Sequence, residues 1–247
     1  MSSSDVKHQA WLLHSRPFRE TSLLLDFLTS DLGRCTVIAL GVKSPRSQRR
    51  GLLQPFVPLQ ITLSGRSELQ NLREVEALGC ACPLTSDRLF AAMYVNELLV
   101  RLLPLHVPDA SVFEAYSALL SSLSQSGMIE PALRTFELDL LESLGYGLQF
   151  THDAETSAGI NPQSWYVLSV DSGFVLQEKM HNPLDSDGKQ ISYSGRILLA
   201  IHDRDFSDIE TRRIAKRLLR TVLQQHLGNR ELASRALFRH ENHGIDG

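Results

Sequence analysis

Leu59-Gln60-Ile61-Thr62-Leu63-Ser64-Gly65 shows the pattern of a β-strand followed by a turn. Apolar and polar residues alternate from Leu59 to Leu63, which is the period of a strand with one buried face. Ser64-Gly65 is a turn signal that ends this strand. Short apolar runs of the same kind cover residues 9–14, 21–28, 34–40 and 69–75. We therefore expect five short strands within the first eighty residues.

Five short strands joined by tight turns indicate a small closed barrel. The five-stranded oligonucleotide-binding barrel (OB-fold) is the common barrel of this size, although a fragment of a sandwich would give a similar pattern. Arg16-Pro17 separates the first two apolar runs, and Asp31-Leu32-Gly33 marks the next turn. The sequence thus predicts an N-terminal barrel over residues 1–80.

From Thr85 onward the apolar period becomes helical. The expected helices cover residues 85–103, 109–123, 131–144, 194–201 and 207–227, with a short terminal helix near residues 233–238, and a hairpin is expected over residues 164–177. We predict an α+β protein in which the barrel is followed by an α-helical domain over residues 81–247. Residues of about 148–192 form a loop and hairpin insertion in that domain.

The charge of the chain is unevenly placed. The net charge is −3 overall, but residues 32–67 contain no Asp or Glu and carry six basic residues. These are Arg34, Lys43, Arg46, Arg49, Arg50 and Arg66. A loop with such a charge is suited to a polyanion, because each phosphate neutralised by Lys or Arg releases condensed counterions. Residues 43–50 are interpreted as the projecting tip of a nucleic-acid site, the alternative being a solvated loop.

Two further features favour contact with nucleic acid. Phe18 lies in a turn between Pro17 and Arg19, where its ring is placed to stack on a base, whereas Phe27 and Phe56 are better read as core. The helix expected over residues 207–227 carries a basic stripe that is either a second phosphate-binding surface or a solvated face. The stripe consists of Arg212, Arg213, Lys216, Arg217 and Arg220.

Chemistry at side chains is not indicated. The sequence has no nucleophile elbow, no phosphate loop with its Lys, and no zinc-protease motif. Cys35, Cys80 and Cys82 have neither disulfide nor zinc spacing, and we interpret the last two as packed thiols. We expect no enzyme activity, no metal and no cofactor. The start of the chain has no signal-peptide pattern, and we expect a cytoplasmic, nucleoid-associated protein.

Arg134 on the expected helix over residues 131–144 allows two readings. It can pair with Glu130 and Glu137, which stand four residues before and three residues after it. Alternatively it can meet an acidic peptide laid on the helix.

Several motifs in combination resemble the bacterial RecO family of DNA repair and recombination mediators. They are Leu12-Leu13-His14-Ser15-Arg16-Pro17-Phe18-Arg19-Glu20-Thr21-Ser22, Leu52-Leu53-Gln54-Pro55-Phe56-Val57-Pro58-Leu59, Tyr94-Val95-Asn96-Glu97-Leu98-Leu99, Glu130-Pro131-Ala132-Leu133-Arg134, Phe136-Glu137, Leu144-Gly145-Tyr146-Gly147 and Ser234-Arg235-Ala236-Leu237-Phe238. The resemblance runs from about Ala10 to Arg239.

The resemblance implies an OB-fold, a helical domain and a non-enzymatic role. Members bind single- and double-stranded DNA and anneal strands coated by single-stranded-DNA-binding protein, and with RecR they help load the RecA recombinase. They hold the acidic, Phe-ended tail of single-stranded-DNA-binding protein in a pocket, to which Arg134, Leu133 and Leu138 correspond here. Some relatives have a four-cysteine zinc module that this chain cannot form. We expect a monomer when free.

Two other functions fit the same residues. One is an adaptor that binds protein partners through the acidic middle, residues 68–160, whose net charge is −9, and does not bind nucleic acid. The other is an OB-fold protein that handles RNA, for which the 2′-hydroxyl would be required.

Overall fold

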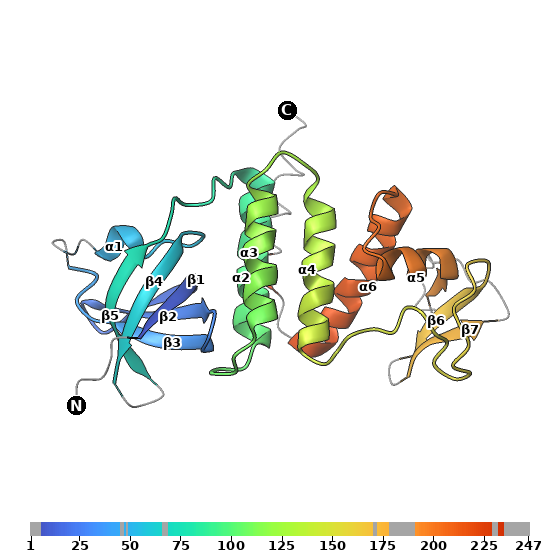
Figure 1. Ribbon diagram of the computed structural model, residues 1–247, viewed down its shortest axis with the longest axis horizontal. Coiled ribbons are helices and arrows are strands. Elements are labelled where there is room, and N and C mark those ends of the chain that lie inside the picture. Colours follow the sequence, from blue (N-terminus) through green and yellow to red (C-terminus); the bar gives the residue numbers. More distant parts are fainter. Residues whose placement is uncertain are drawn as a thin grey trace. The chain divides into compact units, whose positions relative to one another are not determined.

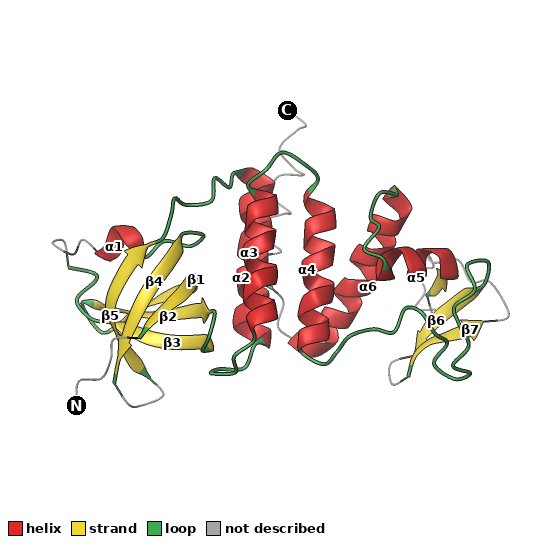
Figure 2. Ribbon diagram, viewed as in Figure 1, coloured by secondary structure: helices red, strands yellow, loops and turns green. Residues whose placement is uncertain are grey.

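The computed structural model describes residues 6–44, 47, 49–65, 69–169, 172–177, 191–228 and 232–234. The elements, in chain order, are β1 (Lys7–Phe18), β2 (Ser22–Thr29), β3 (Gly33–Ala39), α1 (Arg49–Leu52), β4 (Pro58–Ser64), β5 (Gln70–Ala77), α2 (Ser86–Leu102), α3 (Ala110–Leu123), α4 (Ile129–Ser143), β6 (Trp165–Ser169), β7 (Gly173–Gln177), β8 (Ser192–Ser194), α5 (Gly195–His202) and α6 (Ile209–Leu227) (Figure 1). Apart from the short α1, the first five strands precede the helices, and a small sheet lies between α4 and α5 (Figure 2). Among the described residues, no helix has the length and apolar character that a membrane span requires.

The first five strands form a closed barrel in the order β1-β2-β3-β5-β4. β1 closes the barrel by pairing antiparallel with β4, and β3 pairs with β5 in parallel, with Val37 opposite Gln70. This is the strand order of the OB-fold, and the predicted α+β class is confirmed.

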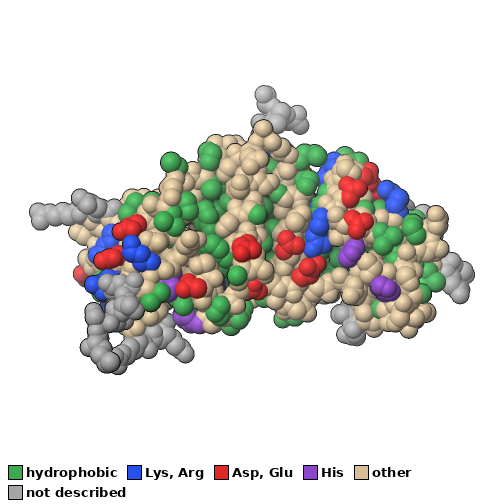
Figure 3. Space-filling view, viewed as in Figure 1, with side chains coloured by type: hydrophobic (Ala, Val, Ile, Leu, Met, Phe, Trp, Pro, Cys, Tyr) green, Lys and Arg blue, Asp and Glu red, His purple; other side chains and the backbone are tan. Residues whose placement is uncertain are grey.

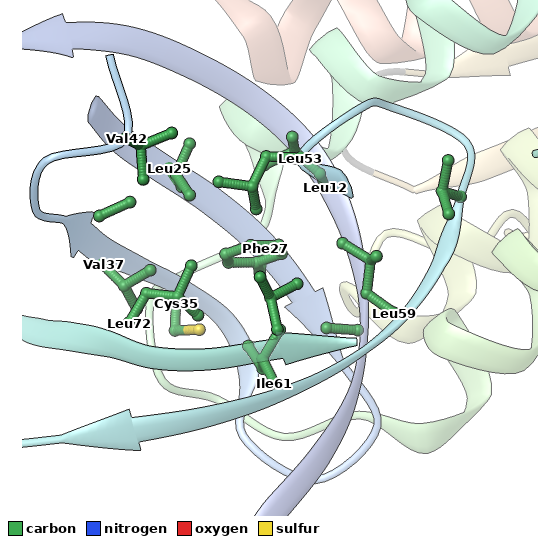
Figure 4. Close-up of a cluster of buried hydrophobic side chains, with 14 residues drawn as sticks. Leu12, Leu25, Phe27, Cys35, Val37, Val42, Leu53, Leu59, Ile61 and Leu72 are labelled. Carbon is green, nitrogen blue, oxygen red and sulfur yellow. The ribbon is translucent and has the colours of Figure 1, made fainter. Parts of the chain in front are cut away.

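The barrel interior is filled by the apolar residues of the alternating strands. Leu59 and Ile61 are fully buried, as are Leu12, Leu25 and Phe27. Figure 4 shows these side chains together with Cys35, Val37 and Leu72 converging inside the barrel. Each large apolar side chain of this kind stabilises the fold by roughly 1.5–3 kcal/mol relative to exposure.

β1 runs through Arg16-Pro17 instead of ending there, which corrects the expectation that these residues separate two strands. Pro17 lies opposite Leu23 of β2, and the pairing of β1 with β4 covers only Lys7 to Trp11. The last third of β1 therefore has β2 as its ladder partner on one side only. Proline, which has no N–H to donate, is tolerated at such a strand edge.

The basic loop after β3 also contains a short helix, α1, where the sequence predicts an irregular loop. The backbone N–H of Leu53 donates to the carbonyl of Arg49, at 3.2 Å, and closes this turn. The helix fixes Arg49 and Arg50 on one turn of backbone.

α2 and α3 pack on the outer side of β1 through polar contacts that the apolar stripe does not predict. β1 shifts register between Leu12 and His14, and the carbonyl of Leu13 at this irregularity accepts from the Asn96 side chain at 3.0 Å. Tyr116 donates to Asn96 in turn, at 2.5 Å. Asn96 is therefore a satisfied, buried link between helix and barrel, which accounts for a polar side chain among the buried residues of α2.

The segment after α2 lies against the start of β3. The N–H of His106 donates to the carbonyl of Arg34, at 2.8 Å. Gly33 has a φ of +68°, and a Cβ placed there would lie 2.0 Å from the carbonyl oxygen of Val107. Only glycine fits this close approach of two backbones.

Glu97 on α2 holds a segment from the far end of the chain. Its carboxylate accepts from the backbone N–H groups of Ala233 and Ser234, both at 2.9 Å, and from the Ser234 hydroxyl at 2.7 Å. Burial raises the pKa of Glu97, but these hydrogen bonds and Arg101 outweigh it and leave the pKa below its ordinary value. Residues 235–238 of the expected terminal helix lie outside the described residues.

The chain divides into two compact units. The first comprises Met1–Ile129 with His226–Gly247, and the second comprises Glu130–Gln225. The predicted division at residue 80 follows the change from strands to helices, whereas this division groups α2 and α3 with the barrel.

The second unit contains α4, α5, nearly all of α6 and a three-stranded sheet in the order β7-β6-β8. The expected hairpin over residues 164–177 is present as β6 and β7. Phe174 contacts Phe150 and Tyr193, with ring centroids 5.4 and 5.6 Å apart, and these three rings form the centre of this region.

Asp153 ties together the loop that precedes this sheet. Its carboxylate accepts from the N–H groups of Glu155, Thr156 and Leu176 and from the Thr156 hydroxyl, at 2.6–3.0 Å. These bonds, with Thr156 the largest contributor, hold the pKa of Asp153 below its ordinary value. Hydrogen bonds to a buried carboxylate thus join β7 to the loop after α4.

Candidate nucleic-acid interface

The turn between β1 and β2 presents an aromatic ring and a guanidinium together. Phe18 ends β1 and is half-buried, and Arg19 follows it with a φ of +52°. The guanidinium carbon of Arg19 lies 5.2 Å from the centroid of the Phe18 ring, within cation–π range. Arg16 stands two residues before Phe18 and is exposed, so both side chains lie on the same face of the strand.

The segment that follows β3 is bound to this turn. The backbone N–H of Lys43 donates to the carbonyl of Thr21, at 2.9 Å, and the Lys43 side chain is exposed. Cations from two distant stretches of sequence therefore lie at one end of the barrel. Arg16, Arg19 and Lys43 form no ion pair with any side chain that the structure describes.

The two arginines of α1 differ. The Arg49 Nη1 lies 3.5 and 3.4 Å from the carbonyl oxygens of Leu72 and Arg73 on β5, at the long limit for hydrogen bonds. Arg50 is exposed. Arg50 is thus the freer of the two to meet a phosphate.

Arg34 is not a free cation, in contrast to its predicted place in the site. Its Nε donates to the carbonyl of Leu103 at 2.9 Å, its Nη1 lies 3.8 Å from Asp26, and the side chain is only 15% exposed. Arg34 fastens the end of α2 to the barrel. Arg46 and Arg66 lie outside the described residues.

The aromatic residues divide as the sequence predicts. Phe27 is completely buried and Phe56 nearly so, and both are core residues. Sequence reasoning missed Arg16 and Arg19 as members of the basic surface, because residues 1–31 carry a slight net negative charge. The signal that could have found them is their placement on either side of Pro17-Phe18.

α6 exposes one basic face and buries the other side. Arg213, Lys216, Arg217 and Arg220 are exposed, whereas Ile214, Ala215, Leu218, Leu219, Val222 and Leu223 are buried. Arg212 was predicted as part of the stripe but is half-buried, and its Nη1 donates to the carbonyls of Phe206 and Ser207, both at 2.7 Å. We call the four exposed cations the α6 face. Arg212 instead holds the loop that enters the helix.

Figure 3 shows Lys and Arg side chains on the barrel and on the second unit, with acidic side chains among them. On the barrel, Lys7 forms an exposed pair with Glu76, 3.5 Å apart. On the second unit, Arg196 pairs with Glu210 of α6, at 3.1 Å. The α6 face begins one turn beyond Glu210.

The predicted peptide-binding residues lie on α4 and are buried. Leu133 is 7% exposed and Leu138 is 2% exposed. The Arg134 Nη1 lies 2.9 Å from Glu137 Oε2, with side chains 6% and 1% exposed, which is the i, i+3 pair that the spacing allows. The Arg134 Nε is buried and has no hydrogen-bond partner among the described residues.

The cysteines do not form a site with one another. Cys35 is buried in the barrel, and burial, with Asp26 as the next cause, raises the pKa of its thiol to about 12. Cys80 is exposed and Cys82 half-buried, so the interpretation of both as packed thiols is wrong for Cys80. Within the part of the chain that the structure describes, no group of three or more His, Cys, Asp or Glu side chains is placed to hold a metal ion.

These observations define an OB-fold protein with a helical second part and exposed cations on both compact units. Comparison with known families narrows this class. The model of the Recombination protein O N terminal matches residues 1–81, and that of the Recombination protein O C terminal matches residues 84–236. The chain belongs to the Recombination protein O (RecO) family, a family of DNA repair and recombination.

Curated relatives agree over nearly the whole chain. DNA repair protein RecO of Methylococcus capsulatus is 44% identical over 230 residues, which cover 93% of this chain and 91% of the relative. DNA repair protein RecO of Escherichia coli O9:H4 is 40% identical over 232 residues, 94% of this chain and 93% of the relative. That of Aliivibrio fischeri is 39% identical over 230 residues, 93% and 94% of the two chains.

Proposed function

We propose that this chain is a recombination mediator with no enzymatic activity of its own. It binds single- and double-stranded DNA, anneals complementary strands coated with single-stranded-DNA-binding protein, and with RecR helps load the RecA recombinase. The observation that carries the proposal is the presence of exposed cations on both compact units, at the β1–β2 turn and on the α6 face.

The barrel cations hold the DNA backbone without reading sequence. Lys43 and Arg50 are exposed, which suits contact with phosphates, and such contacts position a strand but carry no base information. Their binding energy depends on salt, because it comes from the release of counterions.

The α6 face supplies a second surface for annealing. Two DNA strands repel each other, and a protein that brings them together has to screen both backbones. Four exposed cations within two helical turns offer this screening on a surface separate in sequence from the barrel.

Arg134 is the proposed contact for the acidic tail of single-stranded-DNA-binding protein. In the structure its partner is the Glu137 carboxylate, and its Nε has no acceptor among the described residues. A tail carboxylate would replace or join Glu137 at this guanidinium, and Leu133 and Leu138 would contribute apolar contacts to the terminal Phe. The site has to open for the tail to enter, because all three side chains are buried.

The remaining expectations complete the proposal. The free protein is a monomer and acts in the cytoplasm at the nucleoid, where its DNA substrate is. No metal or cofactor takes part in its action.

The decisive experiment measures annealing of complementary strands already coated with single-stranded-DNA-binding protein. A mediator raises the annealing rate on coated strands, whereas a simple DNA binder is blocked by the coat. An adaptor shows no salt-sensitive binding to labelled single strands in fluorescence anisotropy. An RNA-handling protein prefers RNA over DNA of one sequence in competition, since it needs the 2′-hydroxyl.

A further inference from the structure

The Phe18–Arg19 pair differs from the other cations of the barrel. Lys43 and Arg50 are exposed to solvent. Arg19 is also exposed, but its guanidinium carbon lies 5.2 Å from the centroid of the Phe18 ring. Arg19 also has a left-handed backbone, at φ +52°, which is uncommon for a residue with a Cβ. The turn pairs a planar cation with an aromatic ring at the surface.

A planar guanidinium held over an aromatic ring offers a stacking surface that is backed by that ring. Nucleobases stack on aromatic rings and on Arg planes, and this stacking is insensitive to base identity. The bases of a duplex are already stacked on each other and offer no free face. An unpaired base therefore gains a contact at this turn that a duplex cannot gain.

Phosphate contacts are available beside the pair. The backbone bond from Lys43 to Thr21 holds the Lys43 segment against the turn, and Arg16 lies on the same strand face as Phe18. Glu20, which is exposed next to Arg19, forms no ion pair with a described residue and repels a backbone phosphate from its own position. Phosphates are thus favoured at Arg16 and Lys43, and the base at Phe18–Arg19.

We infer that Phe18 and Arg19 together form a stacking platform for one unpaired base, and that this platform makes the barrel bind single strands more tightly than duplex. This inference rests on the proposed function, because it requires that the barrel binds DNA. In this inference Arg19 is more than a positive charge, because its plane helps to distinguish single-stranded from duplex DNA.

The test compares three probes of equal length, about 12 nucleotides, within the usual range of OB sites. They are a single strand of mixed sequence, the same backbone with stable abasic sites throughout, and the duplex. Wild-type protein is expected to bind the ordinary strand more tightly than the abasic strand by roughly five- to 150-fold, the range for stacking of one base. Arg19→Lys keeps the charge and loses the plane, and should lower this ratio at least threefold.

Controls separate stacking from charge and from folding. Lys43→Ala should weaken binding to the ordinary and abasic strands by the same factor. Phe18→Leu should lower the ratio as Arg19→Lys does, and an unchanged melting temperature for Arg19→Lys shows that the turn still folds.

The possible failures are distinguishable. If wild-type protein binds single strands but the ratio is the same in Arg19→Lys and Phe18→Leu as in wild type, the stacking platform is wrong and the proposed function stands. If wild-type protein binds none of the three probes, the proposed function fails and this inference falls with it.

Discussion

The cations of the barrel and the cation of α4 are held in opposite ways. Lys43 and Arg50 project into solvent without a carboxylate partner among the described side chains. Arg134 has a side chain only 6% exposed, paired at 2.9 Å with a still more buried carboxylate. Exposed charges act in proportion to their number and are screened by salt. A buried charge binds a ligand through the direction and distance of its hydrogen bonds, and salt screens it little.

The comparison favours different kinds of ligand for exposed cations and for a buried one. A long polyanion suits several exposed cations, since each adds a similar increment to binding. A short acidic peptide suits one buried guanidinium, which can hold a carboxylate bidentately in a place from which water is excluded. Four experiments test this difference between exposed and buried charges.

The largest effect is expected at the buried pair. Arg134→Met combined with Glu137→Leu should abolish binding of an acidic, Phe-terminated peptide and leave DNA binding unchanged, as measured by anisotropy with each labelled ligand. Replacing both members keeps the fold, because apolar residues of similar volume usually substitute for a buried ion pair without loss of stability. Arg134→Glu is a poorer variant, since it would bury two carboxylates side by side.

Glu137→Gln alone is the control for this prediction. It keeps Arg134 and removes the internal competitor, so peptide binding should persist or become tighter. Peptide binding that survives in the Arg134→Met, Glu137→Leu protein would place the tail elsewhere on the chain.

The next effect is expected at the barrel. Lys43→Ala with Arg50→Ala should weaken binding to single strands of every sequence alike and flatten the dependence of log K on log salt by about 1.4, at about 0.7 per phosphate contact on single strands. Binding is measured by anisotropy at several salt concentrations. Lys7→Ala is a matched control, because Lys7 is already paired with Glu76. If the salt slope of the Lys43→Ala, Arg50→Ala protein equals that of wild type, Lys43 and Arg50 do not belong to the DNA site.

A smaller effect is expected on the α6 face. Arg213→Ala, Lys216→Ala and Arg220→Ala together should slow annealing several-fold while the affinity for one short single strand changes little. The reason is that the barrel still binds one strand, but the second strand is no longer screened. Annealing is followed by fluorescence quenching between labelled strands. Thr221→Ala, an exposed neutral change on the same helix, controls for helix propensity. If the triple variant anneals strands as fast as the Thr221→Ala protein, the α6 face has no role in annealing.

The smallest effect concerns a buried charge that is fully satisfied. Asp153→Asn should lower the free energy of unfolding by about 1–3 kcal/mol at pH 7, because the carboxylate accepts several hydrogen bonds that the amide cannot all replace. The pKa of Asp153 is depressed in the folded state, so its stabilisation is present above the unfolded pKa of about 3.9 and is lost as the pH falls through the folded pKa. Urea unfolding at pH 7, 5 and 3.5 measures this.

In the Asp153→Asn variant, the loss of unfolding free energy that comes from protonation of Asp153 should be absent. The difference in unfolding free energy between wild type and variant should be the same at pH 7 and pH 5 and should shrink at pH 3.5. A difference that does not change with pH would mean that the Asp153 network is not the source of the shifted pKa.

The barrel and the α6 face were predictable from the sequence to different extents. Alternation at Leu59, Ile61 and their counterparts predicts the strands, because burial on one face has a period of two. Pro17 was misread because strand-edge position is a property of the assembled barrel. The helical period predicts the α6 face, but it cannot show that Arg212 turns toward the carbonyls of Phe206 and Ser207.

The site was harder to predict wherever the partner is distant in sequence. Arg34 looked like the other cations of the acid-free stretch, and its acceptor on Leu103 stands 69 residues away. Arg19 and Lys43 lie at the same end of the barrel because the Lys43 N–H donates to the carbonyl of Thr21. Arg134 and Glu137, three residues apart on one helix, were within reach of sequence reasoning. What spacing could not show is that the pair is buried.

The contact between Glu97 and Ser234 has a consequence for the order in which the chain is made. The second unit, Glu130–Gln225, is continuous, so all of its residues have left the ribosome before Ser234 does. The first unit starts earlier but receives its last described hydrogen bonds, at Glu97, only when residues 233 and 234 emerge. A truncation before residue 233 would therefore weaken the unit that contains the barrel, which is synthesised earlier, and leave the later-made unit covalently complete.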